Sequence, residues 1–161
     1  MLDRISVFIG KTAAWLTLVM VIVTFVVVVM RYVFGVGLIW LQESIIWMHA
    51  FVFMMGAAYT LQQEEHVRVD IFYRNMSPKH KARVDLIGTV LFLLPLCLFL
   101  TWKASDFVAV SWKLEEASRE SGGLPYPLIP LLKTILVVMP VSVALQGISL
   151  AMRSVATLRG R

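Results

Sequence analysis

The chain has 161 residues, of which 59% are hydrophobic, and it carries a net charge of +5 at pH 7. Its mean hydropathy is +0.80, well above that of an ordinary globular domain, so the composition predicts a single membrane domain over residues 1–161. The basic residues are scattered and form no stripe interleaved with aromatic residues, which argues against nucleic acid as a partner. A lone cysteine, Cys97, excludes an internal disulfide and a cysteine-rich metal site.

Four segments are long and apolar enough to cross a hydrocarbon core of about 30 Å, namely residues 12–33, 41–61, 84–103 and 128–152. Because backbone groups must be hydrogen-bonded within the segment in lipid, each is predicted to be a helix. The first is interpreted as a retained signal-anchor, since it is longer than a typical signal core and no small-x-small cleavage pattern follows it.

Lysine and arginine divide unequally between the two sides of this arrangement. Ten lie at the N-terminus, between the second and third segments, or in the tail. The other five are Arg31, Lys103, Lys113, Arg119 and Lys133. The excess predicts that both termini lie in the cytoplasm.

Residues 104–126 follow the third segment on the opposite, periplasmic side. In ASDFVAVSWKLEEASRE, residues 104–120, apolar and charged residues alternate at helical spacing. This pattern fits either a separate amphipathic helix on the membrane surface or an extension of the third helix beyond the membrane. The glycines and prolines of SGGLPYPLIP, residues 121–130, then predict a break.

Polar residues within the second segment predict a face that packs against other helices. Gln42, His49, Gly56 and Gln63 recur every seven residues, and Glu43 begins a neighbouring line. The opposite face, which includes Trp47, Met55 and Ala58, is predicted to meet lipid or an apolar partner. We expect His49 to form a structural hydrogen bond, because His66 and His80 lie in a loop and the spans offer no second haem ligand.

The acidic residues within the predicted spans, Glu43 and Asp85, both lie near a span end. Glu43 is expected to pair with Arg31 or, alternatively, to contact a partner protein. An ion-coupled transporter needs a carboxylate near mid-membrane, and none is present. The chain is therefore not expected to transport a substrate by itself.

Several motifs, in this order, resemble the small membrane subunit of tripartite ATP-independent periplasmic (TRAP) transporters. They are GAAYTLQQEEHVRVDIF at 56–72, the acid Glu43 near the start of the second helix, the pattern of His66, Val67, Val69 and Asp70, the segment SGGLPYPLIPLLK at 121–133, and Gln146 with Gly147. The resemblance covers nearly the whole chain, although the long 104–120 segment resembles only some members.

The resemblance implies a non-catalytic scaffold without a cofactor of its own. A large, elevator-type membrane subunit would carry the organic acid and the coupling sodium ions, and a soluble periplasmic protein would deliver the acid. These two proteins and membrane lipids are the expected partners. The chain itself is expected in the bacterial inner membrane. Residues expected at structural or interface positions are Arg31, Gln42, Glu43, His49, His66, Arg68, Asp70, Lys133 and Gln146.

Two further hypotheses concern the loops. EEHVRVD, residues 64–70, is expected to lock the cytoplasmic turn through charge-assisted hydrogen bonds. Asp70 would accept a bond either from a backbone amide or from Arg68. His66 would bond to a loop carbonyl. On the periplasmic side, the mixed charges are expected to dock the delivery protein. These charges are Lys113, Glu115, Glu116, Arg119 and Glu120.

Two other protein classes stay open as alternatives. A membrane anchor of a redox complex, possibly binding haem, would need facing histidines, and only His49 lies within a span. A small self-assembling multidrug transporter would need an acid in its first span, and residues 12–33 contain none.

Overall fold

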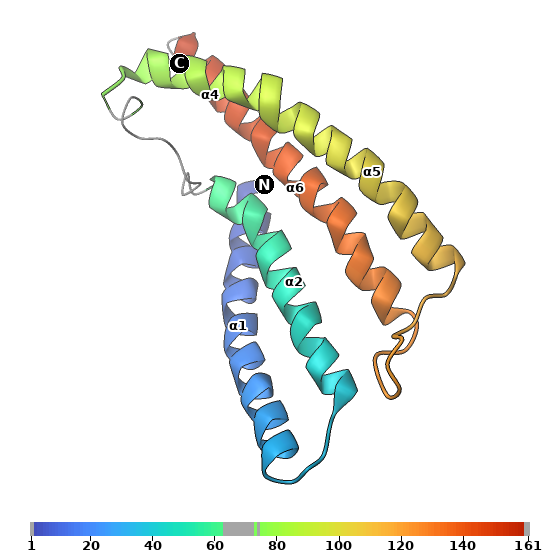
Figure 1. Cartoon of the computed structure of the whole chain (residues 1–161). Coiled ribbons are helices and arrows are strands. Elements are labelled where there is room, and N and C mark those ends of the chain that lie inside the picture. Colours follow the sequence, from blue (N-terminus) through green and yellow to red (C-terminus); the bar gives the residue numbers. More distant parts are fainter. Residues whose placement is uncertain (1, 63–72, 74, 160–161) are drawn as a thin grey trace.

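The computed structural model describes residues 2–62, 73 and 75–159, and of residues 2–11, 13 and 62 it describes the helical backbone alone. This part of the chain is helical without strands, and it contains four helices long and apolar enough to span a membrane (Figure 1). The all-α membrane fold predicted from the sequence is confirmed. The prediction for EEHVRVD, with His66, Arg68 and Asp70, lies outside the described residues.

The first hairpin consists of α1 (Leu2–Tyr32) and α2 (Ile39–Gln62). After α1 the backbone amides of Val33 and Val36 bond back to Val29 and Met30. Gly35 adopts a φ of +69° in this connection, a conformation that only glycine adopts at little cost. The turn therefore ends α1 and directs the chain into α2, which runs antiparallel to α1.

The second hairpin begins with one helix of 36 residues, Pro78–Lys113. It consists of α4 (Pro78–Gly88), a π-helical stretch η1 (Thr89–Leu93) and α5 (Leu94–Lys113). Pro95 lacks a backbone N–H, and its ring would clash with the carbonyl four residues earlier in a regular helix. The π-helical turn immediately before this proline widens the helix where the clash would occur, so the helix continues.

The chain returns as α6 (Leu128–Leu158), which completes the second hairpin and also packs against the first. On one side α6 contacts α2, and on the other it contacts α4, η1 and α5. Gly147 permits the close approach, because a Cβ there would lie 2.5 Å from Leu93 Cδ2. The core comprises Ala58, Leu61, Cys97 and Val143, so small side chains draw three helices together.

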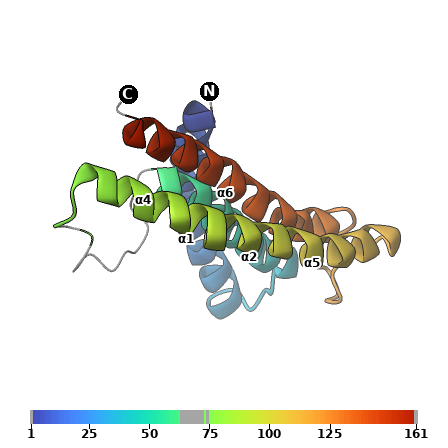
Figure 2. The same cartoon turned by 90° about the horizontal axis from the view of Figure 1, so that it is seen from above.

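The two hairpins are inclined to each other, and the pair α5 and α6 crosses the pair α1 and α2 (Figure 2). The connections 33–38 and 114–127 lie at one end of the molecule, whereas the start of α1, the start of α4 and the end of α6 lie toward the other (Figure 1). Of the two alternatives left open for residues 104–120, the structure has the continuous helix as far as Lys113, followed by a non-helical connection.

The apolar face of α2 does not lie wholly toward lipid or a partner, as the sequence predicted. Met55, Ala58 and Leu61, on or beside the apolar face assigned to lipid or a partner, are buried within the fold. Gln42 and His49 are exposed instead. The ring of His49 stacks on Phe53 with centroids 6.1 Å apart, and the expected structural hydrogen bond is not found among the described residues.

Candidate functional site

The loop 114–127 is held against the start of α2 by Glu43. One carboxylate oxygen of Glu43 accepts a hydrogen bond from the Ser118 hydroxyl, and the other accepts from the Leu124 backbone N–H at 2.7 Å. The Ser118 amide in turn donates to the Leu124 carbonyl at 2.9 Å. Charge-assisted hydrogen bonds of this kind are roughly twice as strong as neutral ones. A single acid therefore joins the first hairpin to a loop 75 to 81 residues away.

Gly123 makes room for this arrangement. A Cβ at this position would lie 2.3 Å from Ser118 Oγ and 2.8 Å from Glu43 Oε2, distances that nonbonded atoms do not tolerate. Gly122 precedes it with a φ of +77°. The two glycines that the sequence marked as a helix break thus have separate roles, one in backbone conformation and one in close packing.

The C-terminal end of α5 determines where the loop begins. The amide of Glu115 bonds to the Trp112 carbonyl, and the amide of Glu116 bonds to the Ser111 carbonyl. Glu115 has a φ of 47°. These bonds form a Schellman motif, in which the residue with positive φ is usually glycine. The motif turns the chain back, so that Glu116 lies beside the last turn of α5 and Glu115 projects into solvent.

Glu116 joins α5 to α6 through an ion pair. Its Oε2 atom accepts from Lys133 Nζ at 2.5 Å and from the Ser111 hydroxyl at 2.6 Å. Lys133 Nζ also lies 4.3 Å from the centroid of the Phe107 ring. Hydrogen bonds from Lys133 first, and from Ser111 second, lower the pKa of the Glu116 carboxyl below its usual value.

Two tryptophans add further links at this end of the molecule. The indole N–H of Trp47 on α2 donates to the Leu128 carbonyl at 3.3 Å. The indole N–H of Trp112 on α5 donates to the Thr134 hydroxyl at 3.0 Å, and its ring meets Tyr126 edge to face. Both ends of the loop are therefore tied to neighbouring helices.

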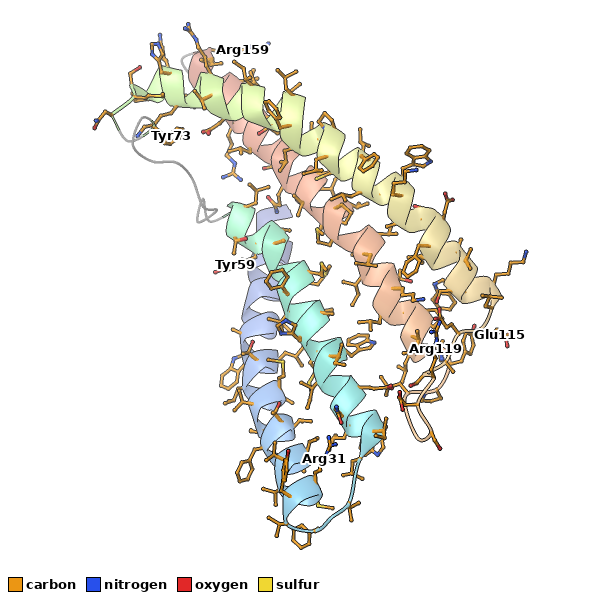
Figure 3. The ribbon with its side chains drawn as sticks, in the orientation of Figure 1. Arg31, Tyr59, Tyr73, Glu115, Arg119 and Arg159 are labelled. Atoms are coloured by element: carbon orange, nitrogen blue, oxygen red, sulfur yellow. The ribbon has the colours of Figure 1, made fainter. Side chains whose placement is uncertain are left out.

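The fixed loop leaves a small charged surface facing solvent. Lys113, Glu115, Arg119 and Glu120 are exposed, whereas Glu116 is half-buried and bound within the fold. Figure 3 shows Glu115 and Arg119 together beside the ends of α5 and α6. The described residues contain no group of three His, Cys, Asp or Glu side chains that could hold a metal ion.

The structure gives Glu43 partners other than Arg31. Arg31 is exposed near the end of α1, away from the 114–127 loop (Figure 3). The prediction that Glu43 pairs with Arg31 was wrong. The loop instead supplies two hydrogen-bond donors, Ser118 and Leu124, which lie far from Glu43 in sequence. Of the remaining predicted residues, Lys133 and Gln146 lie within the fold, Lys133 in its ion pair and Gln146 buried on α6.

Sequence reasoning did not single out Ser118, Ser111 or Thr134, although each binds a partner on another segment or at a helix end. Serine and threonine are common in loops and membrane helices, so their types gave no signal. Gly123 did give a signal, because it is the second residue of a Gly-Gly pair. That pattern indicated a turn, however, and not a close approach to a carboxylate.

Comparison with known proteins gives a consistent match. Residues 20–159 match the family described as "Tripartite ATP-independent periplasmic transporters, DctQ component". The C4-dicarboxylate TRAP transporter small permease protein DctQ of Vibrio cholerae serotype O1 is 28% identical over 71 residues. This alignment covers 44% of the present chain, which spans only 30% of the length of that curated relative. No solved structure matches the chain.

Proposed function

Since the chain belongs to the family of DctQ components of tripartite ATP-independent periplasmic transporters, we propose that it is the non-catalytic scaffold of such a transporter. Family membership and four helices of membrane-spanning length make it a protein of the bacterial inner membrane. Its proposed partners are a large, sodium-coupled membrane subunit of the elevator type and a periplasmic protein that delivers an organic acid. The sodium ions and the acid would bind to these partners.

The observation that carries the proposal is the fixed loop 114–127. Glu43, Gly123 and the Glu116–Lys133 pair tie it to α2 and α6, while four charges face outward. A preorganised surface loses less conformational entropy when it binds a partner. Mixed charges at such a surface guide a weak, transient encounter. Both properties suit a protein that must bind its delivery partner and release it in each transport cycle.

The exposed polar face of α2 supports a second contact, within the membrane. Gln42 and His49 lie on a membrane-spanning helix and are exposed. Polar side chains in a span usually face protein, because facing lipid is costly. We assign this face to the large subunit, whose polar groups would bond Gln42 and His49. Interhelical hydrogen bonds in membranes contribute about 0.6–2 kcal/mol each.

Purification from native membranes tests the scaffold role. The tagged chain should retain, in mild detergent and at one-to-one stoichiometry, a protein with many more membrane spans, identified by mass spectrometry. His49→Leu should lower the yield of this partner, and Phe53→Leu, an apolar change beside it, should not. Recovery of the chain alone, as a homo-oligomer, would contradict the scaffold role.

Charge reversal tests the docking surface separately. Glu115→Lys should lower uptake at low salt and weaken its salt dependence, while the large subunit still co-purifies. Glu115→Gly is the matched control for folding, because glycine suits the positive φ of this residue. Unchanged uptake and unchanged salt dependence in Glu115→Lys would rule out docking through this residue.

A further inference from the structure

A shallow apolar groove lies between α5 and α6. It has a volume of about 340 Å³ and is lined by Leu94 on one helix and by Ile148, Ala151, Met152 and Val155 on the other. Every lining side chain is apolar. The groove lies on helices that span the membrane, so a hydrocarbon chain is the chemistry it fits.

On each helix, the face that lines the groove continues to basic residues near the end of the helix. On α6, Ile148, Met152, Val155 and Arg159 are spaced by four, three and four residues and therefore share one face. On the neighbouring helix, Lys79, Arg83 and Leu86 have the same spacing up to the π-helical stretch, and Val90 and Leu94 follow at intervals of four, which suits the wider π-helical turn. The side chains of Lys79, Arg83 and Arg159 are exposed.

The packing of the two helices brings these basic residues to one level. Thr89 and Leu93 meet α6 at Gly147. Seven residues further toward the same end, Ala82 and Ser154 are both buried. Since α4 and α6 are in contact, Lys79 near the start of α4 and Arg159 at the end of α6 lie at the same end of the molecule. Figure 3 shows Arg159 at the end of α6 beside α4.

We propose that the groove and its basic rim form a binding site for an anionic phospholipid. An acyl chain would lie along Leu94, Ile148 and Met152, and the phosphate headgroup would lie among Lys79, Arg83 and Arg159. Basic pockets between membrane helices characteristically bind anionic headgroups. The proposal depends on the membrane location of the chain and not on its role in transport.

The test is native mass spectrometry of the full chain, purified with the proteins that it retains and equilibrated with defined micelles. One set contains phosphatidylglycerol and the other phosphatidylcholine with the same acyl chains. The chain should retain phosphatidylglycerol preferentially. Lys79→Gln, Arg83→Gln and Arg159→Gln should each lower its apparent affinity about fivefold, and the triple variant should abolish the preference.

Two matched variants make the result specific. Neutralising three exposed basic residues at the opposite end, by Arg31→Gln, Lys103→Gln and Lys113→Gln, changes the net charge equally and should leave the preference intact. Ala151→Phe should obstruct the groove and lower retention of both lipids, with an unchanged thermal midpoint as its check on folding.

Other outcomes would overturn the proposal. An equal loss in the control triple variant would mean that net charge, and no particular site, attracts the lipid. If a folded Ala151→Phe variant retained both lipids fully, the headgroup would bind without an acyl chain in the groove. Retention by the isolated chain but not by its complex with a larger subunit would mean that protein covers the groove.

Discussion

Glu43 and Gly123 act on the same loop, so their effects on stability are expected to overlap. Glu43→Gln replaces one acceptor oxygen with an NH₂ group, which cannot accept from Ser118 or Leu124, and should cost about 1–3 kcal/mol. Gly123→Ala should cost a similar amount by forcing a Cβ against Ser118 and Glu43. Because either change releases the loop, the double variant should lose little more than one single variant.

Thermal unfolding of the purified chain in detergent measures all three variants. Gly37→Ala is the control for the glycine, since a Cβ at position 37 meets no atom within 4 Å. Losses that add fully in the double variant would show that the two residues stabilise different parts of the fold.

The lowered pKa of Glu116 gives the loop a predictable response to acid. Its carboxyl titrates below the usual value of 4.5 because Lys133 and Ser111 stabilise the charged form in the folded state. The resulting stabilisation is fully present above pH 4.5 and is lost as the pH falls through the lowered pKa. Glu116→Gln should therefore lose less thermal stability than the native chain between pH 6 and pH 3.

The matched control for this pH series is Glu120→Gln, which removes an exposed carboxylate from the same loop. It should retain the pH dependence of the native chain. If Glu116→Gln and the native chain lose stability in parallel over this range, the ion pair with Lys133 does not contribute to the acid response.

At the residue scale, the sequence predicted which side chains matter better than it predicted their partners. Glu43 and Lys133 were expected at structural or interface positions, whereas Glu116 was expected to be an exposed docking charge and is half-buried in an ion pair. The partners of Glu43 lie 75 and 81 positions away, and a helical period carries no information over that distance. Arg31 is the basic residue nearest to Glu43 in sequence, whereas in the folded chain Ser118 and Leu124 bond to Glu43.

At the level of helices, Gly147 determines how closely the second hairpin closes. Gly147→Leu should push α6 away from η1, because even a Cβ would meet Leu93 and Thr89. We expect a loss of about 2 kcal/mol or more, within the usual range for overpacking. The measurement is the thermal midpoint in detergent. Gly88→Leu, on the same hairpin, is the control, since a Cβ there meets nothing within 4 Å.

A Gly147→Leu variant as stable as Gly88→Leu would mean that the two helices adjust freely at their closest approach. Such tolerance would be unexpected in a membrane protein, where association of helices relies on close packing of small residues and less on the hydrophobic effect.

The number of helices was predictable from hydropathy, but their ends were not. Hydropathy identifies the length that lipid buries, whereas a helix continues wherever its backbone bonds remain favourable. The third span was predicted over 84–103 and extends over Pro78–Lys113. Pro78 starts it, as proline often does at a first helical position, and the Schellman motif after Lys113 ends it.

At the scale of the whole molecule, the chain buries little of its apolar surface within itself. Most of the long apolar residues of α1, including Trp15, Ile22 and Phe25, are exposed. Between two helices in lipid, burying apolar side chains brings little gain. The fold instead uses small residues and polar bonds at one end to join its hairpins. Periodicity therefore identifies a distinctive face on α2, but not whether this chain or a partner covers it.

The orientation of the molecule remains a prediction, and the structure offers a direct way to measure it. The connections 33–38 and 114–127 lie at one end, and the start of α4 and the end of α6 lie toward the other (Figure 1). The native cysteine, Cys97, is buried, so it should give little background labelling. Cysteines introduced at the exposed positions Ser121 and Thr157 can therefore report on the two ends separately.

In spheroplasts, a membrane-impermeant maleimide should label Ser121→Cys at once and Thr157→Cys only after the membrane is opened. This outcome follows from the positive-inside rule, because basic residues concentrate at the end that carries Lys79, Arg83 and Arg159. The reverse pattern would place the 114–127 loop in the cytoplasm, where it could not meet a periplasmic protein. A single labelling experiment thus tests both the predicted topology and the geometric requirement for docking.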